Sequence, residues 1–149
     1  MKDYDVQKDL NALLKGEQMA VESYEKFINA AGNEAVRNGL RDIQKGHRQN
    51  AEELAGRIQD LGGRPDYNTG ISGVIVNARL AMETKDMNDS IELLKRAYDG
   101  EDRGIAAAEE VMAGGLDEES RRLVVHMLDR DHGHLRTMLF LMSEYGYRQ

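Results

Sequence analysis

Hydrophobic residues recur at alternating steps of three and four along most of this chain, which is the pattern of amphipathic α-helices. One such stretch runs from Asp5 to the turn at Ala31-Gly32-Asn33, and a second runs from that turn to Gly62-Gly63. Gly32 suits the C-terminal end of the first helix, and Asn33 suits the N-terminal cap of the second. We therefore expect two long helices packed antiparallel around this turn.

The second half of the chain repeats this arrangement. A third helix is expected to begin at Asp86 or Asn88 and to end at Gly114-Gly115. A fourth is expected to begin after Asp117, a good N-terminal cap, and its hydrophobic stripe continues to Tyr145. The sequence thus contains two helical pairs.

Residues 62–86 separate the two pairs and have a different composition. The segment GGRPDYNTGISG is rich in turn-forming residues, and GVIVNARLAMETK, residues 73–85, is compatible with a short helix. Two antiparallel pairs joined by a long crossover predict an all-α fold, an antiparallel four-helix bundle of ferritin-like topology. The length of 149 residues favours one domain, 1–149.

Composition excludes several classes of function. Acidic and basic residues are interspersed and the net charge is −7, so no basic stripe is available for nucleic acid. No apolar run approaches the roughly 18 residues of a membrane span and no export signal is visible, so we expect a cytoplasmic protein without a membrane partner. The absence of cysteine removes disulfides, thiolate catalysis and sulfur-ligated metals.

Six polar residues interrupt the hydrophobic stripes, where an unpaired buried charge would cost several kcal/mol. They are Glu17, Gln44, His47, Glu101, Asp131 and His134. His126 and His132 fall outside the stripe and are expected at the surface. Glycine comes directly before Glu17, His47, Glu101 and His134, and we expect these glycines to let the helices approach closely.

Counting from the turns indicates that the six residues meet at one height. Glu17 lies fifteen residues before Gly32 and His47 fifteen after it, so both are about 22 Å from that turn. Glu101 lies thirteen residues before Gly114, and Asp131 sixteen after Gly115. Carboxylates and imidazoles gathered inside a bundle are the donor set of a divalent metal site.

The sequence also resembles a known group of proteins. The segment LLKGEQMAVESY, residues 13–24, is similar to the first helix of rubrerythrins and bacterioferritin relatives, and NDSIELLKRAYDGED, residues 88–102, is similar to a small bacterial ferritin-like family. The resemblance extends from about Asp5 to Tyr145. The family pattern is Glu, Glu-x-x-His, Glu and Glu-x-x-His on successive helices, and it binds two iron or manganese ions.

The resemblance implies a role for each of the six residues. Glu17 and Glu101 would be terminal ligands, His47 and His134 nitrogen ligands and Asp131 a bridge, with Tyr24 beside them. Gln44 stands where the family has glutamate, so it would be a weak ligand or a hydrogen-bond donor. Three carboxylates leave two divalent ions with a surplus charge of +1, so one or two ions per chain are expected: iron, with manganese or zinc as alternatives.

Two hypotheses of function follow. The first is a non-haem metal protein that reacts iron with oxygen or peroxide, or sequesters it; the chain has no cysteine-ligated rubredoxin-like centre, so an electron donor would be external. The second is a bundle for interaction or assembly whose metal site has decayed. Whether the protein is an enzyme is left open, and a homo-oligomer, a dimer, is the expected partner state.

Overall fold

The structure, a computed structural model, describes residues 3–68 and 89–146. These residues form four long α-helices and no strand. The elements are α1 (Asp3–Ala30), α2 (Glu34–Asp60), α4 (Ser90–Ala113), α5 (Glu118–Leu141) and a π-helical turn, η1 (Met142–Gly146). The short helix expected at residues 73–85 lies outside the described residues.

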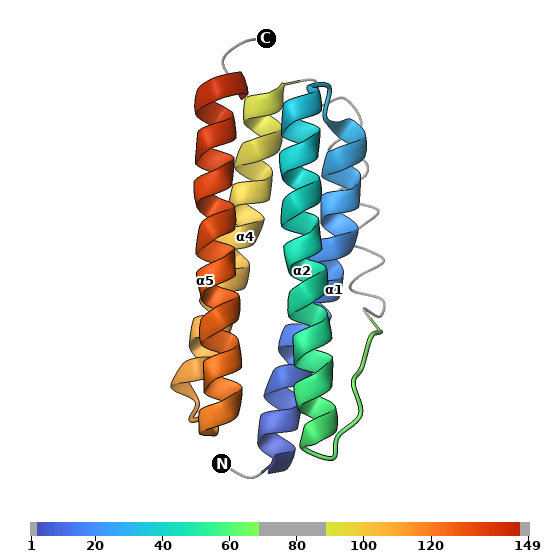
Figure 1. Cartoon of the computed structure of the whole chain (residues 1–149), viewed down its shortest axis with the longest axis vertical. Helices are drawn as coiled ribbons and strands as arrows, with labels where there is room; N and C mark the ends of the chain where they lie inside the picture. The colour runs from blue at the N-terminus through green and yellow to red at the C-terminus, as the bar shows by residue number, and fades with distance from the viewer. Residues whose placement is uncertain (1–2, 69–88, 147–149) are drawn as a thin grey trace.

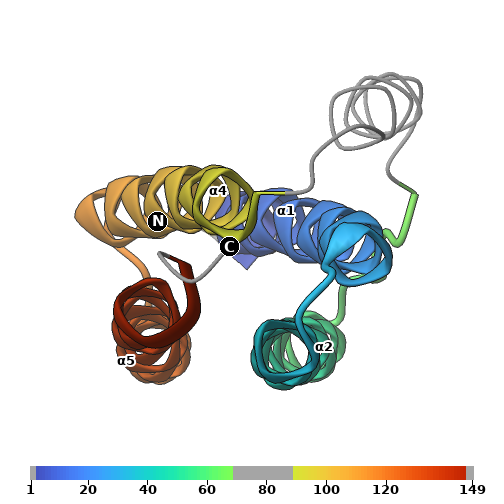
Figure 2. The ribbon, with the colours of Figure 1, turned by 90° about the horizontal axis from the view of Figure 1, so that it is seen from above.

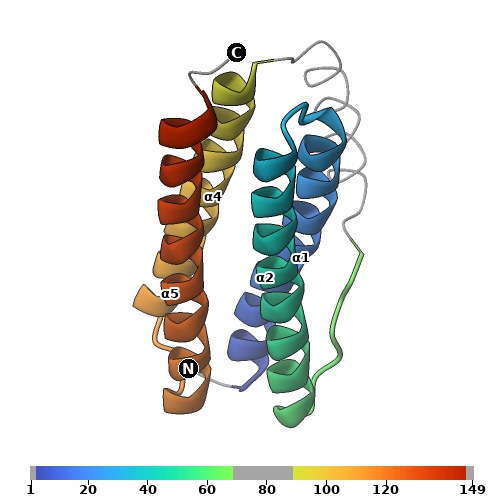
Figure 3. The same ribbon diagram turned by 45° about the horizontal axis from the view of Figure 1, so that its top comes forward.

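The four helices form the predicted bundle (Figure 1). Seen from above, α1 and α4 make one layer and α2 and α5 the other (Figure 2). Each helix contacts its chain neighbour and one helix of the other pair, α1 against α4 and α2 against α5. The tilted view shows that α2 ends at the opposite end of the bundle from the start of α4 (Figure 3). The end of α2 and the start of α4 are thus placed as a ferritin-like topology requires.

Side-chain caps fix where three helices begin. Asn33 Oδ1 accepts from the backbone N–H of Val36 at 3.1 Å, and the Asp117 carboxylate accepts from that of Ser120 at 3.1 Å, as expected. The cap of α4 is Asp89, which accepts from Ile91 N–H at 2.9 Å, and the helix begins at Ser90. The expected start at Asp86 or Asn88 is therefore slightly early, because the side chain that caps the helix is that of Asp89.

The turns after the helices differ from one another. Gly62 and Gly115 have φ values of 80° and 89°, a backbone conformation that favours glycine. Gly32, expected at the C-terminal end of the first helix, lies two residues after the last residue of α1 and has no positive φ, so it does not end the helix in the left-handed conformation that favours glycine. Instead, α1 closes with the N–H of Ala31 donating to the carbonyl of Phe27 at 3.0 Å.

The interior consists of two apolar clusters with a polar layer between them. One cluster, near the α1–α2 turn, includes Phe27, Leu40, Leu94 and Met138. The other, toward the opposite end, includes Leu10, Leu54, Ile58 and Val124. The buried polar residues between them are Glu17, Gln44, His47, Asn50, Glu101, Asp131 and His134. All six residues singled out from the sequence are therefore inside the bundle.

Candidate metal centre

His47 lies at the middle of the polar layer, between two carboxylates. Its Nδ1 atom is 2.5 Å from Glu17 Oε2, and its Nε2 atom is 2.8 Å from Glu101 Oε2. The first contact joins α1 to α2 and the second joins α2 to α4. The equal heights counted from the Gly32 turn are thus observed as a direct contact between Glu17 and His47.

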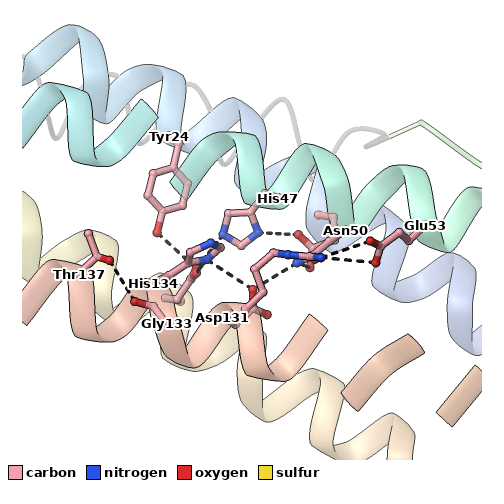
Figure 4. Close-up of polar contacts among 11 residues, drawn as sticks. Tyr24, His47, Asn50, Glu53, Asp131, Gly133, His134 and Thr137 are labelled. Carbon is pink, nitrogen blue, oxygen red and sulfur yellow. Dashed lines mark hydrogen bonds and ion pairs between the residues drawn. The ribbon is translucent and has the colours of Figure 1, made fainter. Parts of the chain in front are cut away.

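His134 reaches the same carboxylate from α5. Its Nδ1 atom is 2.5 Å from Glu101 Oε1 and 3.5 Å from Asp131 Oδ1. The Tyr24 hydroxyl donates to Glu101 Oε2 at 3.3 Å, and the Tyr24 ring stacks on the imidazole of His47 with centroids 5.3 Å apart (Figure 4). Glu101 therefore links both histidines and the tyrosine.

Four side chains in this layer offer donor atoms to one point. One ligand atom each from His47, Glu101, Asp131 and His134 lies within 4.8 Å of the others, and all four residues are buried. Two nitrogens and two carboxylate oxygens suit borderline divalent ions such as Fe²⁺, Mn²⁺ or Zn²⁺. Two neutral imidazoles and two carboxylates would also balance the charge of one such ion. The residues present therefore fit a metal ion.

The remaining two predicted ligands are placed differently. Glu17 contacts the ring nitrogen of His47 and lies outside the group of four. Gln44 directs its amide nitrogen to α1, donating to the Val21 carbonyl at 3.0 Å and to Glu25 Oε2 at 2.9 Å. The contacts of Gln44 are thus those of a hydrogen-bond donor between α1 and α2, one of the two roles expected for it.

Asn50 is a member of the layer to which the sequence assigned no role. It is fully buried, and its amide nitrogen donates to Glu17 Oε1 at 3.3 Å and to Asp131 Oδ1 at 3.2 Å. Its carbonyl oxygen accepts from Arg130, which also pairs with Glu53 at 3.2 Å. Its position in the sequence could have indicated this role, because Asn50 follows His47 by three residues on the same buried stripe and a buried amide needs hydrogen-bond partners.

The charges of the layer are strongly coupled. Burial disfavours a charged His47, but its hydrogen bonds to Glu101 and Glu17 outweigh this and raise its pKa well above the usual value. Burial likewise disfavours a charged Glu101, and hydrogen bonds from His134 and His47 overcome it, lowering the pKa to about 2. Without a metal, a protonated His47 therefore neutralises part of the carboxylate charge.

The pKa values of Asp131 and Tyr24 are both raised, which favours the neutral form of each side chain. Burial first, and then the charges of Glu17 and Glu101, raise the pKa of Asp131 to about 7. Burial, followed by the charge of Glu101, raises the pKa of Tyr24 well above its usual value, so the phenol stays protonated. At neutral pH Tyr24 is a donor, and Asp131 holds a proton part of the time.

Only one of the four flanking glycines allows the close approach that was expected. A β-carbon on Gly46 would lie 2.4 Å from Nε2 of His134. A β-carbon on Gly16 would meet nothing within 4 Å, and those on Gly100 and Gly133 would meet only an arginine of the same helix. The expectation is confirmed at Gly46 and wrong at the other three.

A cavity of about 690 Å³ between α1 and α4 explains the space around Gly16 and Gly100, which both line it. Its lining also includes the small residues Ala12, Ala20, Gly104 and Ala107, and the polar residues Glu17, His47, Glu101 and Asp131. The cavity, called the α1–α4 groove below, therefore leads from the surface to the polar layer. His126 and His132 are exposed, as predicted.

Comparison with known proteins agrees with this fold. The bacterioferritin-related protein of Bacteroides fragilis, described as a dodecameric thioferritin, superposes with a TM-score of 0.77 at 20% identity, over 97% of this chain and 88% of that one. No curated protein matches. In the described part of the chain no helix is long and apolar enough to cross a membrane. The family model of the domain of unknown function (DUF2383) matches residues 5–114, so the chain belongs to that family, on a ferritin-like fold.

Proposed function

We propose that this protein binds iron at His47, Glu101, Asp131 and His134, and either reacts it with oxygen or peroxide or sequesters it. The observation that carries the proposal is the convergence of these four buried donors within 4.8 Å. The ferritin-like fold adds support. When bound, iron would supply the redox chemistry, and the protein would supply geometry, charge and access.

The residues around the donors have defined tasks in this proposal. Glu17 holds Nδ1 of His47 and so orients its Nε2 toward Glu101, an arrangement common behind metal-binding histidines. The Tyr24 hydroxyl fixes one oxygen of Glu101. The α1–α4 groove provides an opening through which ions and small molecules reach the layer. A reaction that consumes electrons would take them from an external donor, because the chain has no cysteine-ligated rubredoxin-like centre.

The test is metal binding under anaerobic conditions. Purified protein is mixed with Fe²⁺, the bound ions per chain are measured by mass spectrometry of the metal, and oxygen is then admitted while ferric absorbance is recorded. Wild type should bind iron and oxidise it, and His134→Ala should lose most of this binding. The exposed His126→Ala is the matched control and should behave as wild type. Bound iron that stays ferrous in air would favour sequestration of iron(II) over oxidation.

A second candidate function, assembly with a decayed metal site, has its own support. Both ring nitrogens of His47 and both ends of the Asn50 amide already have partners, so the polar layer is satisfied without an ion. Leu139 and Phe140 are 52% and 58% exposed side by side on α5, as in a contact between copies of the chain. Wild type that binds no metal but forms a defined homo-oligomer by light scattering would establish this function instead.

A further inference from the structure

We propose that the centre holds one ion rather than two, and that the amide of Asn50, fixed by Arg130, takes the place of a second cation between Glu17 and Asp131. This inference rests on the proposed metal-binding function. It concerns how many ions the polar layer admits and which residue sets that number.

The first support is the position of the Asn50 amide nitrogen. It donates to Glu17 on α1 at 3.3 Å and to Asp131 on α5 at 3.2 Å, and so joins two carboxylates from different helices. Two carboxylates that face each other in a buried layer need a positive group between them. The N–H bonds of Asn50 already supply that partial positive charge, and the side chain fills the space.

The second support is the orientation of this amide, which Arg130 determines. The two ends of an asparagine side chain have nearly the same shape, so hydrogen-bond partners decide which end points where. A guanidinium only donates, so the end of Asn50 that faces Arg130 must be the carbonyl oxygen. Arg130 is itself held by Glu53 at 3.2 and 3.5 Å. The amide nitrogen is therefore kept toward the carboxylates.

The third support is charge. Glu101 and Asp131 together offset one divalent ion, and Glu17 is occupied by His47 and Asn50. A second ion would bring four positive charges against three carboxylates, beside the cation of Arg130. Gln44 does not remedy this, because an amide is neutral and its nitrogen is directed to α1. Electrostatics thus favours a single ion.

The proposal predicts which substitution creates a second site. Equilibrium dialysis against Zn²⁺, and against Fe²⁺ without oxygen, followed by metal analysis should give one ion per wild-type chain. Asn50→Asp adds a carboxylate oxygen in place of the amide nitrogen and should raise the count to two. Asn38→Asp adds the same charge at an exposed position of α2 and should leave it at one. Gln44→Glu should also leave it at one.

Two further measurements keep the test decisive if Asn50→Asp does not fold. Arg130→Gln frees the Asn50 amide to turn its oxygen inward, and should admit a second ion with lower affinity. Anomalous diffraction from metal-soaked wild-type crystals should show one peak in the layer. Two peaks in wild type, an unchanged count in both Asn50→Asp and Arg130→Gln, or a second ion in Gln44→Glu would overturn the role of Asn50. No ion in wild type would overturn the proposed function itself.

Discussion

A β-carbon on Gly46 of α2 would lie 2.4 Å from Nε2 of His134 on α5. The imidazole thus occupies the space that any other residue at position 46 would need. The ring has little freedom to move away, because its Nδ1 atom is bonded to Glu101 at 2.5 Å. The absence of a side chain at Gly46 therefore positions a candidate ligand.

Gly46→Ala should weaken metal binding at least tenfold, because the new methyl group displaces His134 from Glu101. Gly56→Ala is the matched control on the same helix, where a β-carbon meets nothing within 4 Å. It should leave binding unchanged and raise stability by about 1 kcal/mol, the usual gain when alanine replaces glycine inside a helix. Calorimetric metal titration and thermal unfolding measure both effects. Equal affinities for the two variants would contradict this role of Gly46.

Metal binding should release protons. The pKa of His47 is raised, since hydrogen bonds to Glu101 and Glu17 outweigh burial, so in the metal-free protein its imidazole carries a proton that a metal ion must displace. Apparent affinity should therefore increase as the pH rises from 6 to 8. Titration calorimetry in buffers of different ionisation enthalpy counts the number of protons released per ion bound. Glu17→Gln should reduce this number, because it removes one of the two carboxylates that hold the proton.

Asp131→Asn should abolish metal binding and stabilise the metal-free protein. Burial and the charges of Glu17 and Glu101 raise the pKa of Asp131 to about 7. The folded state then binds more protons than the unfolded state, so Asp131 makes the metal-free protein less stable as the pH rises from about 4 to 7. Asparagine removes this loss and should stabilise the metal-free protein by about 1–3 kcal/mol at pH 8. The gain should nearly vanish at pH 4, and metal binding should be lost at both pH values. A gain independent of pH would contradict the assignment.

The positions of the donors along the helices and the contact between Glu17 and His47 could be predicted from the sequence, but the partners of the two buried amides could not. Counting from the turns placed Glu17 beside His47, because a straight helix rises by a constant amount per residue. Asn50 and Gln44 are one turn on either side of His47, and periodicity cannot distinguish which of two amides faces α5 and which faces α1. The α1–α4 groove was also not predictable, because it depends on the distance between two helices rather than on either pattern alone.

The Asp117 carboxylate should make the junction between α2 and α5 sensitive to acid. It caps α5 and pairs with Arg57 at 2.8 Å. Burial raises the pKa of Asp117, but hydrogen bonds from Ser120 and Arg57 outweigh it and lower the pKa below its usual value. Asp117 therefore stabilises the folded protein above the unfolded-state pKa, and this stabilisation is lost as the pH falls through the folded-state pKa. Asp117→Ala should cost about 1 kcal/mol at pH 7. Asp117→Asn keeps a cap and should lose less, with no loss specific to low pH.

Filling the α1–α4 groove should slow metal entry without changing the number of ions bound. Gly104 lines the groove, and a β-carbon there meets nothing within 4 Å. Gly104→Leu should reduce the rate of Co²⁺ uptake measured by stopped-flow absorbance, while the final occupancy stays that of wild type. Ala106→Leu, at an exposed position of the same helix outside the groove, is the control and should load at the wild-type rate. Equal rates for the two variants would show that ions enter elsewhere.

The two apolar clusters on either side of the polar layer each include residues of all four helices. They hold the helices in register from both ends, so the donors in the middle keep their places whether or not a cation is there. Binding or release of an ion would therefore require no helix to fold or unfold. Under the proposed function, such a bundle would be suited to repeated binding and release of its ion, in contrast to small domains that exist only while their metal is bound.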